Sequence, residues 1–498
     1  MALVRTAFPF PARTPSWFAG HMARSLRELP GLLDEVDMVV EARDARLPLT
    51  SVNPAFDSML ERVWGHSGVG LDRKGMSKRK LVVYTKRDLA EQRYEAPLKK
   101  AFMNQTGQRV LFADSRVDAD VKQVLRVAAT MAREAGETLT ELKVLVVGMP
   151  NVGKSSLLNG LRRVGVRKGK AFTTGAMPGV TRRLTGTVKI YDDPKIYVFD
   201  TPGVMMPFLG HSEAGSERGL KLAITAGIKD GLFEPDAIAD YLLYKLNLRL
   251  ATEATLAEGD KARHECYTSH LPFKGAFERT DDLSVFLDEL ALRLGAILKG
   301  GERNTEASMA FFLKQFREGK LGRWTLDDLD GVESAFISSI TPDQPAPGAR
   351  IELLDHNGLP ITVSDMGAVG STSEAAFAEA TAATNAAAAK AAEDDDDFLA
   401  ADIPMPPTLP ETLQDRVSLT VARFLEQAAE ERAAADAGRN KSATQVRKAQ
   451  REALSQVRDT KRKAKYESGG SFGGKSSSGR PSGKAKGRPS GRGRSGKR

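Results

Sequence analysis

The residues best suited to chemistry lie in one short segment after an apolar stretch. Gly148-Met-Pro-Asn-Val-Gly-Lys-Ser155 has the spacing G-x-x-x-x-G-K-S and directly follows the run LKVLVV. Glycines let backbone N–H groups turn toward phosphate oxygens, a following helix N-terminus adds positive potential, and the lysine reaches the β- and γ-phosphates. The segment is therefore predicted to bind a nucleotide, with Ser155 Oγ as an Mg²⁺ ligand. The predicted phosphate contacts are Pro150, Asn151, Val152, Gly153, Lys154, Ser155 and Ser156.

Two motifs further along the chain predict a sensor of the third phosphate. Asp200-Thr-Pro-Gly203 follows the apolar run KIYVF. In a D-x-x-G motif the aspartate positions Mg²⁺ through water while the glycine N–H meets the γ-phosphate. Pro178-Gly-Val-Thr181 lies between the two motifs, and the Thr181 hydroxyl could complete the Mg²⁺ shell only when the γ-phosphate is present. The alternative is that Thr181 only faces solvent.

A third motif predicts which base is bound. Thr85-Lys86-Arg87-Asp88 ends the apolar run LVVY and has the form [NT]-K-x-D. The carboxylate of Asp88 can accept two hydrogen bonds from the N1 and N2 groups of guanine, which adenine cannot supply. Ala113-Asp114-Ser115, at the end of the next apolar run, is the predicted backbone contact with the base. The predicted ligands are therefore GTP and GDP.

These motifs need a parallel sheet to bring them together. Short apolar runs that end in polar residues are typical of buried parallel strands, which deliver loops at their carboxyl ends. Two such runs occupy residues 81–88 and 109–115. Further strands are predicted at 36–45, at 142–147 and in the segments TVKIYDD and KIYVFDTPG. Helical spacing is expected over 22–34. This alternation predicts an α/β, doubly wound domain over residues 17–210.

The order of the motifs differs from that of an ordinary Ras-like GTPase, in which the phosphate loop comes first. Here Asp88 precedes Gly148. This order resembles the circularly permuted GTPases, and the segments WFAGHMARSLRELPGLLDEVDMVVEARDARLPL, GMPNVGKSSLLNGLR, PGVT and DTPG resemble the YlqF/RbgA branch over about residues 16–330. The resemblance implies a circularly permuted Ras-like P-loop fold, hydrolysis of GTP to GDP and phosphate, and assembly of the large ribosomal subunit. Two features depart from it: Thr85 stands where the branch usually has Asn, and the tail after residue 335 has no obvious counterpart.

The resemblance also bears on how hydrolysis proceeds. It implies that His21 positions or activates the attacking water, and that Asn151 holds a K⁺ ion against the phosphates. The alternatives are that His21 caps or packs a helix, and that Asn151 forms a turn, because asparagine tolerates left-handed backbone angles. Val204 stands where a glutamine often orients the water. Intrinsic hydrolysis is therefore expected to be slow.

Three further parts are expected after the α/β domain. Helical patterns dominate residues 211–335, and the resemblance implies that these form an RNA-binding domain. Residues 336–410 are Pro/Ala-rich with an acidic run, which predicts a linker. Residues 411–498 are expected to form a long exposed helix followed by a flexible basic tail.

The net charge of +9 is concentrated in that tail. Residues 441–498 hold 18 Lys or Arg and 3 Asp or Glu, a net charge of +15, so the rest of the chain carries −6. Such a tail is typical of a polyanion partner, usually nucleic acid; the alternative is a tail that only maintains solubility. With Cys266 as the single cysteine, intrachain disulfides are excluded. No apolar run approaches the length of a membrane-spanning helix.

The first sixteen residues, MALVRTAFPFPARTPS, contain two arginines and no acid, which resembles a mitochondrial targeting segment interrupted by prolines. Residues 1–16 therefore predict a mitochondrial protein, in the matrix or in peripheral contact with the inner membrane. The nucleolus or the cytoplasm is the alternative.

Two functional hypotheses remain open from the sequence. The first is a GTP-hydrolysing assembly factor that binds ribosomal RNA and promotes maturation of the large, mitochondrial, ribosomal subunit. The second is a nucleotide-dependent regulatory protein with little hydrolysis, which docks a partner or an anionic surface. Stimulation of hydrolysis by large ribosomal subunits would distinguish the first from the second.

Overall fold

The computed structural model describes residues 5–11, 20–64, 79–134, 141–169, 171–172, 187–192, 195–201, 209, 212–229, 231–255, 265–273, 277–340 and 412–436. Residues 1–432 form one compact unit, and residues 433–498 form a second. The predicted sensor residues Thr181 and Gly203, most of the expected linker and the basic tail lie outside the described residues. Among the described helices, none has the length and apolar character needed to cross a membrane.

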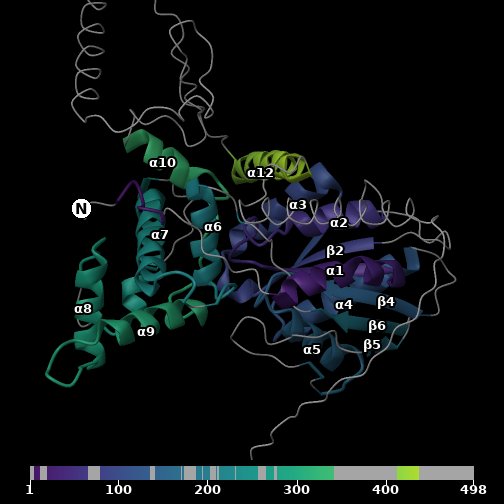
Figure 1. The fold of residues 1–498 in the computed structure, drawn as a ribbon, viewed down its shortest axis with the longest axis horizontal. Coiled ribbons are helices and arrows are strands. Elements are labelled where there is room, and N and C mark those ends of the chain that lie inside the picture. Colours follow the sequence, from purple (N-terminus) through teal and green to yellow (C-terminus); the bar gives the residue numbers. More distant parts are fainter. Residues whose placement is uncertain are drawn as a thin grey trace, which may run out of the picture. The chain divides into compact units, whose positions relative to one another are not determined.

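A six-stranded sheet with the order β3-β2-β1-β4-β6-β5 carries the predicted motifs (Figure 1). The parallel pairs are β1 with β2, β1 with β4, β2 with β3 and β4 with β6, whereas β5 runs antiparallel to β6. Successive strands β1, β2 and β3 extend the sheet in one direction, and β4 then returns to the other side of β1. The carboxyl ends of β1 and β4 therefore flank a topological switch point, where α/β proteins bind ligands. The strands are β1 (Met38–Asp44), β2 (Arg79–Thr85), β3 (Arg109–Ala113), β4 (Glu141–Val147), β5 (Val188–Asp192) and β6 (Lys195–Asp200).

Helices cover both faces of the sheet, which confirms the predicted doubly wound α/β fold (Figure 1). Because successive side chains of a strand point to opposite faces, Val39 packs under the helices of one face and Val40 under those of the other. The first face carries α1 (Gly20–Glu35), α2 (Pro54–Trp64) and α3 (Glu95–Thr106), and the second carries α4 (Asp118–Glu134) and α5 (Lys154–Gly165).

The helical region after the sheet shares a hydrophobic cluster with the phosphate loop. Met149 and Val152 of that loop are buried in the same cluster as Tyr267, Phe286 and Phe312 of the helical region. The ring centroids of Phe286 and Phe312 lie 4.8 Å apart. Movement of the loop therefore disturbs a core that the helices also need. The described helices of this region are α6 (Ser212–Ile224), α7 (Pro235–Thr255), α8 (Leu283–Leu294), α9 (Thr305–Arg317) and α10 (Val332–Ile340), with the short 3₁₀ turn η3 (Tyr267–His270). Two other 3₁₀ turns, η1 (Arg87–Leu89) and η2 (Gln92–Tyr94), follow β2 in the α/β domain.

The connection between α9 and α10 runs along the carboxyl edge of β1 and β2. Trp324 N donates to Leu89 O at 3.0 Å, and Leu326 N donates to Arg46 O at 2.9 Å. The Asp327 carboxylate accepts hydrogen bonds from Leu49 N at 2.8 Å and Thr50 N at 2.9 Å. This stretch, residues 321–330, is called the edge connection below. It ties the loops after β1 and β2 to the helical region.

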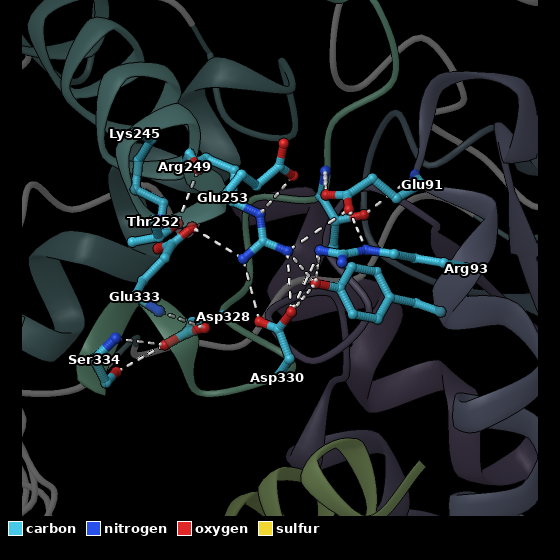
Figure 2. Close-up of polar contacts among 12 residues, drawn as sticks. Glu91, Arg93, Lys245, Arg249, Thr252, Glu253, Asp328, Asp330, Glu333 and Ser334 are labelled. Atoms are coloured by element: carbon cyan, nitrogen blue, oxygen red, sulfur yellow. Dashed lines mark hydrogen bonds and ion pairs between the residues drawn. The ribbon is translucent and has the colours of Figure 1, made fainter. Parts of the chain in front are cut away.

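A buried ionic network strengthens this attachment, and Figure 2 shows its side chains converging from α7, the edge connection and the segment after β2. Arg249 of α7 donates to Asp330 at 3.1 Å and lies 3.6 Å from the Glu91 carboxylate. Arg93 also pairs with Glu91, at 2.8 Å. Burial alone would raise the pKa of Asp330, but Arg249 outweighs it and lowers that pKa to about 2. Removing one member of such a network leaves a buried charge without its partner, which is strongly destabilising.

Residues 5–11, part of the expected targeting segment, pack on the helical region. Phe8 is buried, with its ring centroid 5.0 Å from that of Tyr241 and 5.6 Å from that of Tyr244. The Arg5 guanidinium donates two hydrogen bonds to Asp240, at 3.0 and 2.8 Å. These residues therefore contribute to the helical core.

The helix expected to be exposed near the C-terminal end is packed instead against the α/β domain. In α12 (Leu413–Asp436), Val417 and Val421 are fully buried in the cluster that contains Leu98 and Phe102 of α3. The expectation of an exposed helix was wrong for this part because apolar residues four apart form a stripe within an otherwise charged sequence.

The burial of α12 leads to a stability prediction. Val421→Asp places a carboxylate in the contact with α3, so we expect α12 to detach, because an unpaired buried charge is costly. Leu419→Asp on the same helix is the matched control, since Leu419 is 38% exposed. Hydrogen exchange of residues 413–432 should accelerate at least about 100-fold in the Val421 variant, corresponding to a few kcal/mol of lost protection. Equal exchange in the two variants would contradict the packing.

Candidate functional site

The phosphate loop owes its shape to two glycines between β4 and α5. Gly148 has a φ of +146°, and a Cβ atom there would lie 2.2 Å from Ala42 O of β1. Gly153 has a φ of +96° and is the N-cap of α5. Any larger residue at 148 would push the loop away from β1. The loop is therefore held tightly over the switch point of the sheet.

Lys154, the first residue of α5, is buried beneath this loop. Its Nζ donates to Met149 O at 2.8 Å and to Gly148 O at 3.2 Å. Burial lowers the pKa of Lys154 to about 8, although the Asp200 carboxylate opposes the shift. A phosphate group beside Nζ would favour the charged amine and raise that pKa again. The loop thus offers a desolvated cation suited to an anionic ligand.

Asp200 and Ser155 form the second part of the site. Asp200 ends β6 directly opposite Val146 of β4, and Ser155 Oγ donates to its Oδ2 at 3.0 Å. The other carboxylate oxygen, Oδ1, is buried without a hydrogen-bond partner among the described residues. Burial raises the pKa of Asp200 above its ordinary value. A hydroxyl and a carboxylate with a spare oxygen are the donors that Mg²⁺ prefers, so these residues fit the ion.

The predicted base motif contacts the phosphate loop directly. Thr85 ends β2, and its Oγ1 lies within hydrogen-bond distance of Arg43 O, at 3.0 Å, and of Val152 O. Lys86 has a left-handed backbone, with a φ of 55°, and its Nζ donates to Asn151 O at 2.7 Å. The structure therefore brings together two motifs that lie more than sixty positions apart in the chain.

Asp88 and the segment 113–115 lie beside each other. Ala113 pairs with Thr85 in the register of β2 and β3. The backbone N of Arg116 donates to Asp114 Oδ1 at 2.9 Å, and Arg116 Nη2 lies 3.0 Å from Asp114 Oδ2. Arg116 also pairs with Asp88. The side chain of Arg116 is 72% exposed. The two predicted base contacts thus share one edge of the sheet and one exposed arginine.

Asn151 combines a left-handed backbone with a contact to the helical region. Its φ is 56°, which suits a turn-forming asparagine. Its Nδ2 lies 3.5 Å from Thr225 O, just after α6. Arg317 of α9 holds the same helix end through Ile224 O and Ala223 O, both at 2.9 Å. The phosphate loop therefore faces the end of α6.

Four residues singled out in the sequence cannot be related to the site by the described part of the structure. Thr181 and Gly203 lie outside the described residues, as does Val204. His21 lies in the first turn of α1, but its side chain is outside the described part of the chain. Their roles stay predictions.

Two residues with a place in the site were not predicted. Asp44 ends β1, and its Oδ2 pairs with Lys86 Nζ at 2.9 Å and with Arg46 Nη2 at 2.8 Å. The signal that identified Thr85–Asp88, an apolar run ending in charged residues, is also present in VVEARDAR. Asp44 and Arg46 could have been selected on that ground.

The chain is similar in sequence to several known GTPases. A family model described as 50S ribosome-binding GTPase matches residues 143–246. The chain is 35% identical over 341 residues to mitochondrial ribosome-associated GTPase 1 of Xenopus tropicalis, covering 65% of this chain and 98% of that protein. It is 33% identical to the protein of that name from Bos taurus, covering 65% and 92%. Mitochondrial GTPase 1 of Schizosaccharomyces japonicus is 31% identical, with coverage of 63% and 90%.

The chain is also similar to a solved structure. GNP-bound YlqF from T. maritima is 20% identical and covers 61% of this chain and 97% of that chain, with a TM-score of 0.39. The sequence relatives carry the assignment, because each is more than 30% identical and almost fully covered. The chain belongs to the family of mitochondrial ribosome-associated GTPase 1.

Proposed function

We propose that this protein hydrolyses GTP in mitochondria and promotes maturation of the large ribosomal subunit, whose RNA it binds. The observation that carries the proposal is the hydrophobic cluster that the phosphate loop shares with the helical region. Because the loop and the helices share this core, a movement of the loop on nucleotide binding can shift a ribosome-binding surface on the helices directly. The names of the relatives, which are mitochondrial and ribosome-associated GTPases, support the cellular part of the proposal.

The nucleotide contacts in this proposal follow the geometry of the strand ends. Thr85, Lys86 and Asp88, with the segment 113–115, bind the guanine base. Residues 150–156 surround the phosphates, and Lys154 supplies the buried cation. Ser155 and, through water, Asp200 would hold Mg²⁺, which would neutralise charge on the β- and γ-phosphate oxygens.

The catalytic part of the proposal uses residues around the γ-phosphate. Thr181 would complete the Mg²⁺ shell and Gly203 N–H would meet the γ-phosphate, so both contacts would form only with GTP. His21 positions the attacking water, and Asn151 holds a K⁺ ion. Intrinsic hydrolysis is slow, because Val204 cannot orient water through a hydrogen bond.

The division of labour follows the chain. Residues 17–210 form the GTPase domain, and residues 211–335 form the RNA-binding helical domain that begins shortly after Gly203. GTP fixes the ribosome-binding arrangement and hydrolysis releases it. The basic residues of 441–498 add electrostatic attraction to RNA, and any contact with the inner membrane is peripheral.

Stimulation by ribosomal subunits tests the proposed function. Large mitochondrial subunits should raise the rate of GTP hydrolysis about tenfold or more, because ordering a switch supplies the transition-state contacts missing from the free enzyme. Small subunits at the same concentration are the control for nonspecific RNA effects. A rate that does not change with large subunits would favour the regulatory protein with little hydrolysis.

A further inference from the structure

Asp44 is a buried carboxylate near the phosphate loop that the proposed function leaves unused. It is 3% exposed and lies at the carboxyl end of the central strand β1. Arg46 binds it with Nε and the backbone N, both 3.0 Å from Oδ1, and with Nη2, 2.8 Å from Oδ2. Burial alone would raise the pKa of Asp44, but Arg46 and Lys86 outweigh it and hold that pKa well below its usual range. The carboxylate is therefore ionised whenever the protein is folded near neutral pH.

The ion pair with Lys86 connects three loops at one ammonium group. Nζ of Lys86 lies 2.9 Å from Asp44 Oδ2 after β1 and 2.7 Å from Asn151 O in the loop after β4. Lys86 itself follows β2 and precedes the predicted base contact Asp88 by two residues. Moving Nζ thus shifts the phosphate loop relative to the base motif.

Arg46 joins this arrangement to the helical region. Its side chain is 2% exposed, and its guanidinium carbon lies 5.7 Å from the ring centroid of Phe316 in α9. The backbone O of Arg46 accepts the hydrogen bond from Leu326 of the edge connection. A planar guanidinium bound at one edge to a carboxylate and stacked on a ring has little freedom to turn.

We propose that Asp44 is a positioning residue for nucleotide binding. It orients the Lys86 side chain, which holds the phosphate loop at the correct distance from the base motif. The orientation of Asp44 in turn depends on the position of α9, because Arg46 binds Asp44 and lies over Phe316 of that helix. A buried ion pair is seldom needed for stability, since apolar residues often replace it without loss. Here the ion pair fixes a geometry: an ammonium group held by Asp44 can bind Asn151 O in only one position of the phosphate loop. The inference rests on the proposed assignment of Thr85–Asp88 to the base.

The test compares nucleotide affinity with stability in two matched variants. Asp44→Asn removes the charge that orients Lys86 and keeps the shape of the side chain. We expect the Kd values for GDP and GTP to rise by the same factor, about tenfold to 100-fold. The equal factor follows because Lys86 joins the base motif to the phosphate loop and does not meet the γ-phosphate in this assignment. Titration with fluorescent guanine nucleotides measures both values.

Glu41→Gln is the matched control, because Glu41 is a buried carboxylate on the same strand. It is 1% exposed and pairs with Arg43 and Lys80, each at 2.8 Å, away from the phosphate loop. It should lower the melting temperature of the nucleotide-free protein and leave both Kd values within about twofold. A parallel loss of affinity in the two variants would mean that Asp44 is only structural.

Lys86→Met supplies the second readout. If Asp44 acts through Lys86, adding Asp44→Asn to Lys86→Met should change the GDP Kd by less than about twofold. Additive losses would overturn the inference. Should the Asp44 variant fail to fold, Phe316→Leu is the alternative, because it keeps an apolar side chain in α9 and removes the ring under Arg46. A rise in the GDP Kd of roughly two- to fivefold, as expected from the loss of a cation–π contact, supports the link between α9 and Asp44. An unchanged Kd overturns it. Wild-type protein without guanine preference would refute the base assignment and thus the proposed function instead.

Discussion

Asp88→Asn is expected to lower the affinity for GTP by roughly 10²-fold and to raise the affinity for xanthosine triphosphate. The carboxylate accepts two hydrogen bonds from guanine N1 and N2, and an amide can accept from only one of these donors while it presents a donor to the other. Losing a bidentate, charge-assisted contact costs about 2–3 kcal/mol, which corresponds to this factor. Xanthine carries an oxygen in place of the N2 group, so the asparagine NH₂ can donate to it.

The structure provides a control for this experiment. Arg116 pairs with Asp88 but its side chain is 72% exposed, and exposed ion pairs contribute little. Arg116→Ala should therefore change GTP affinity by less than about threefold and leave the base preference as it is. Competitive titrations with GTP, ATP and xanthosine triphosphate measure both variants. An Asp88 variant that keeps the wild-type preference would remove Thr85–Asp88 from the site.

The sequence predicted the strands well because buried parallel strands carry a strong local signal. Each of β1, β2, β3 and β4 is a short run rich in apolar residues, and each was expected within a few residues of its observed bounds. The helix α3 was not anticipated, because its sequence EAPLKKAFMNQT contains a proline and only three large apolar residues. It is stabilised by tertiary contacts of Leu98 and Phe102 with the sheet and α12. Local propensity therefore underestimates it.

The site was predictable where one motif supplies a whole contact and not where partners lie far apart in the chain. The phosphate loop is defined by eight consecutive residues. Asp44 carries the same local signal as Thr85–Asp88, but its contact with the base motif became clear only when the sheet placed it beside Thr85, because its partner Lys86 is 42 positions away. Arg46 depends on Phe316, which no local pattern could connect with it. Residues whose role is to position others are thus the ones that need the fold.

The helical region and the edge connection contact the segments around the nucleotide site at two separate places. The first is the ion pair between Arg249 of α7 and Glu91, which lies in the segment that follows Asp88. The second includes the hydrogen bond from Leu49 N, in the loop that follows Asp44 and contains Arg46, to the carboxylate of Asp327. The first contact is a buried ion pair and the second is a set of hydrogen bonds from backbone N–H groups to a buried carboxylate, so both are costly to leave unmade. This arrangement suits a protein whose helices and GTPase domain act together.

The second large effect is expected at Asn151 and concerns K⁺. Replacing Na⁺ by K⁺ at equal ionic strength should speed GTP hydrolysis about tenfold or more, because a cation held against the phosphates stabilises charge that develops on the transferring group. The Asn151 side-chain oxygen is a neutral ligand suited to a large monovalent ion. Such an ion would act where an arginine finger otherwise does, and would partly replace what Val204 cannot provide.

Two substitutions distinguish the contribution of the Asn151 side chain from that of its backbone conformation. The φ of 56° is strained for alanine and free for glycine. Asn151→Gly therefore keeps the loop, including the backbone O that Lys86 binds, and removes only the amide. Both Asn151→Gly and Asn151→Ala should abolish the advantage of K⁺ over Na⁺, while only the alanine variant weakens GDP binding. Single-turnover hydrolysis in each salt, with and without large ribosomal subunits, measures the ratio. If the glycine variant keeps the K⁺ advantage, or if the wild type shows none, Asn151 is only a turn-forming residue.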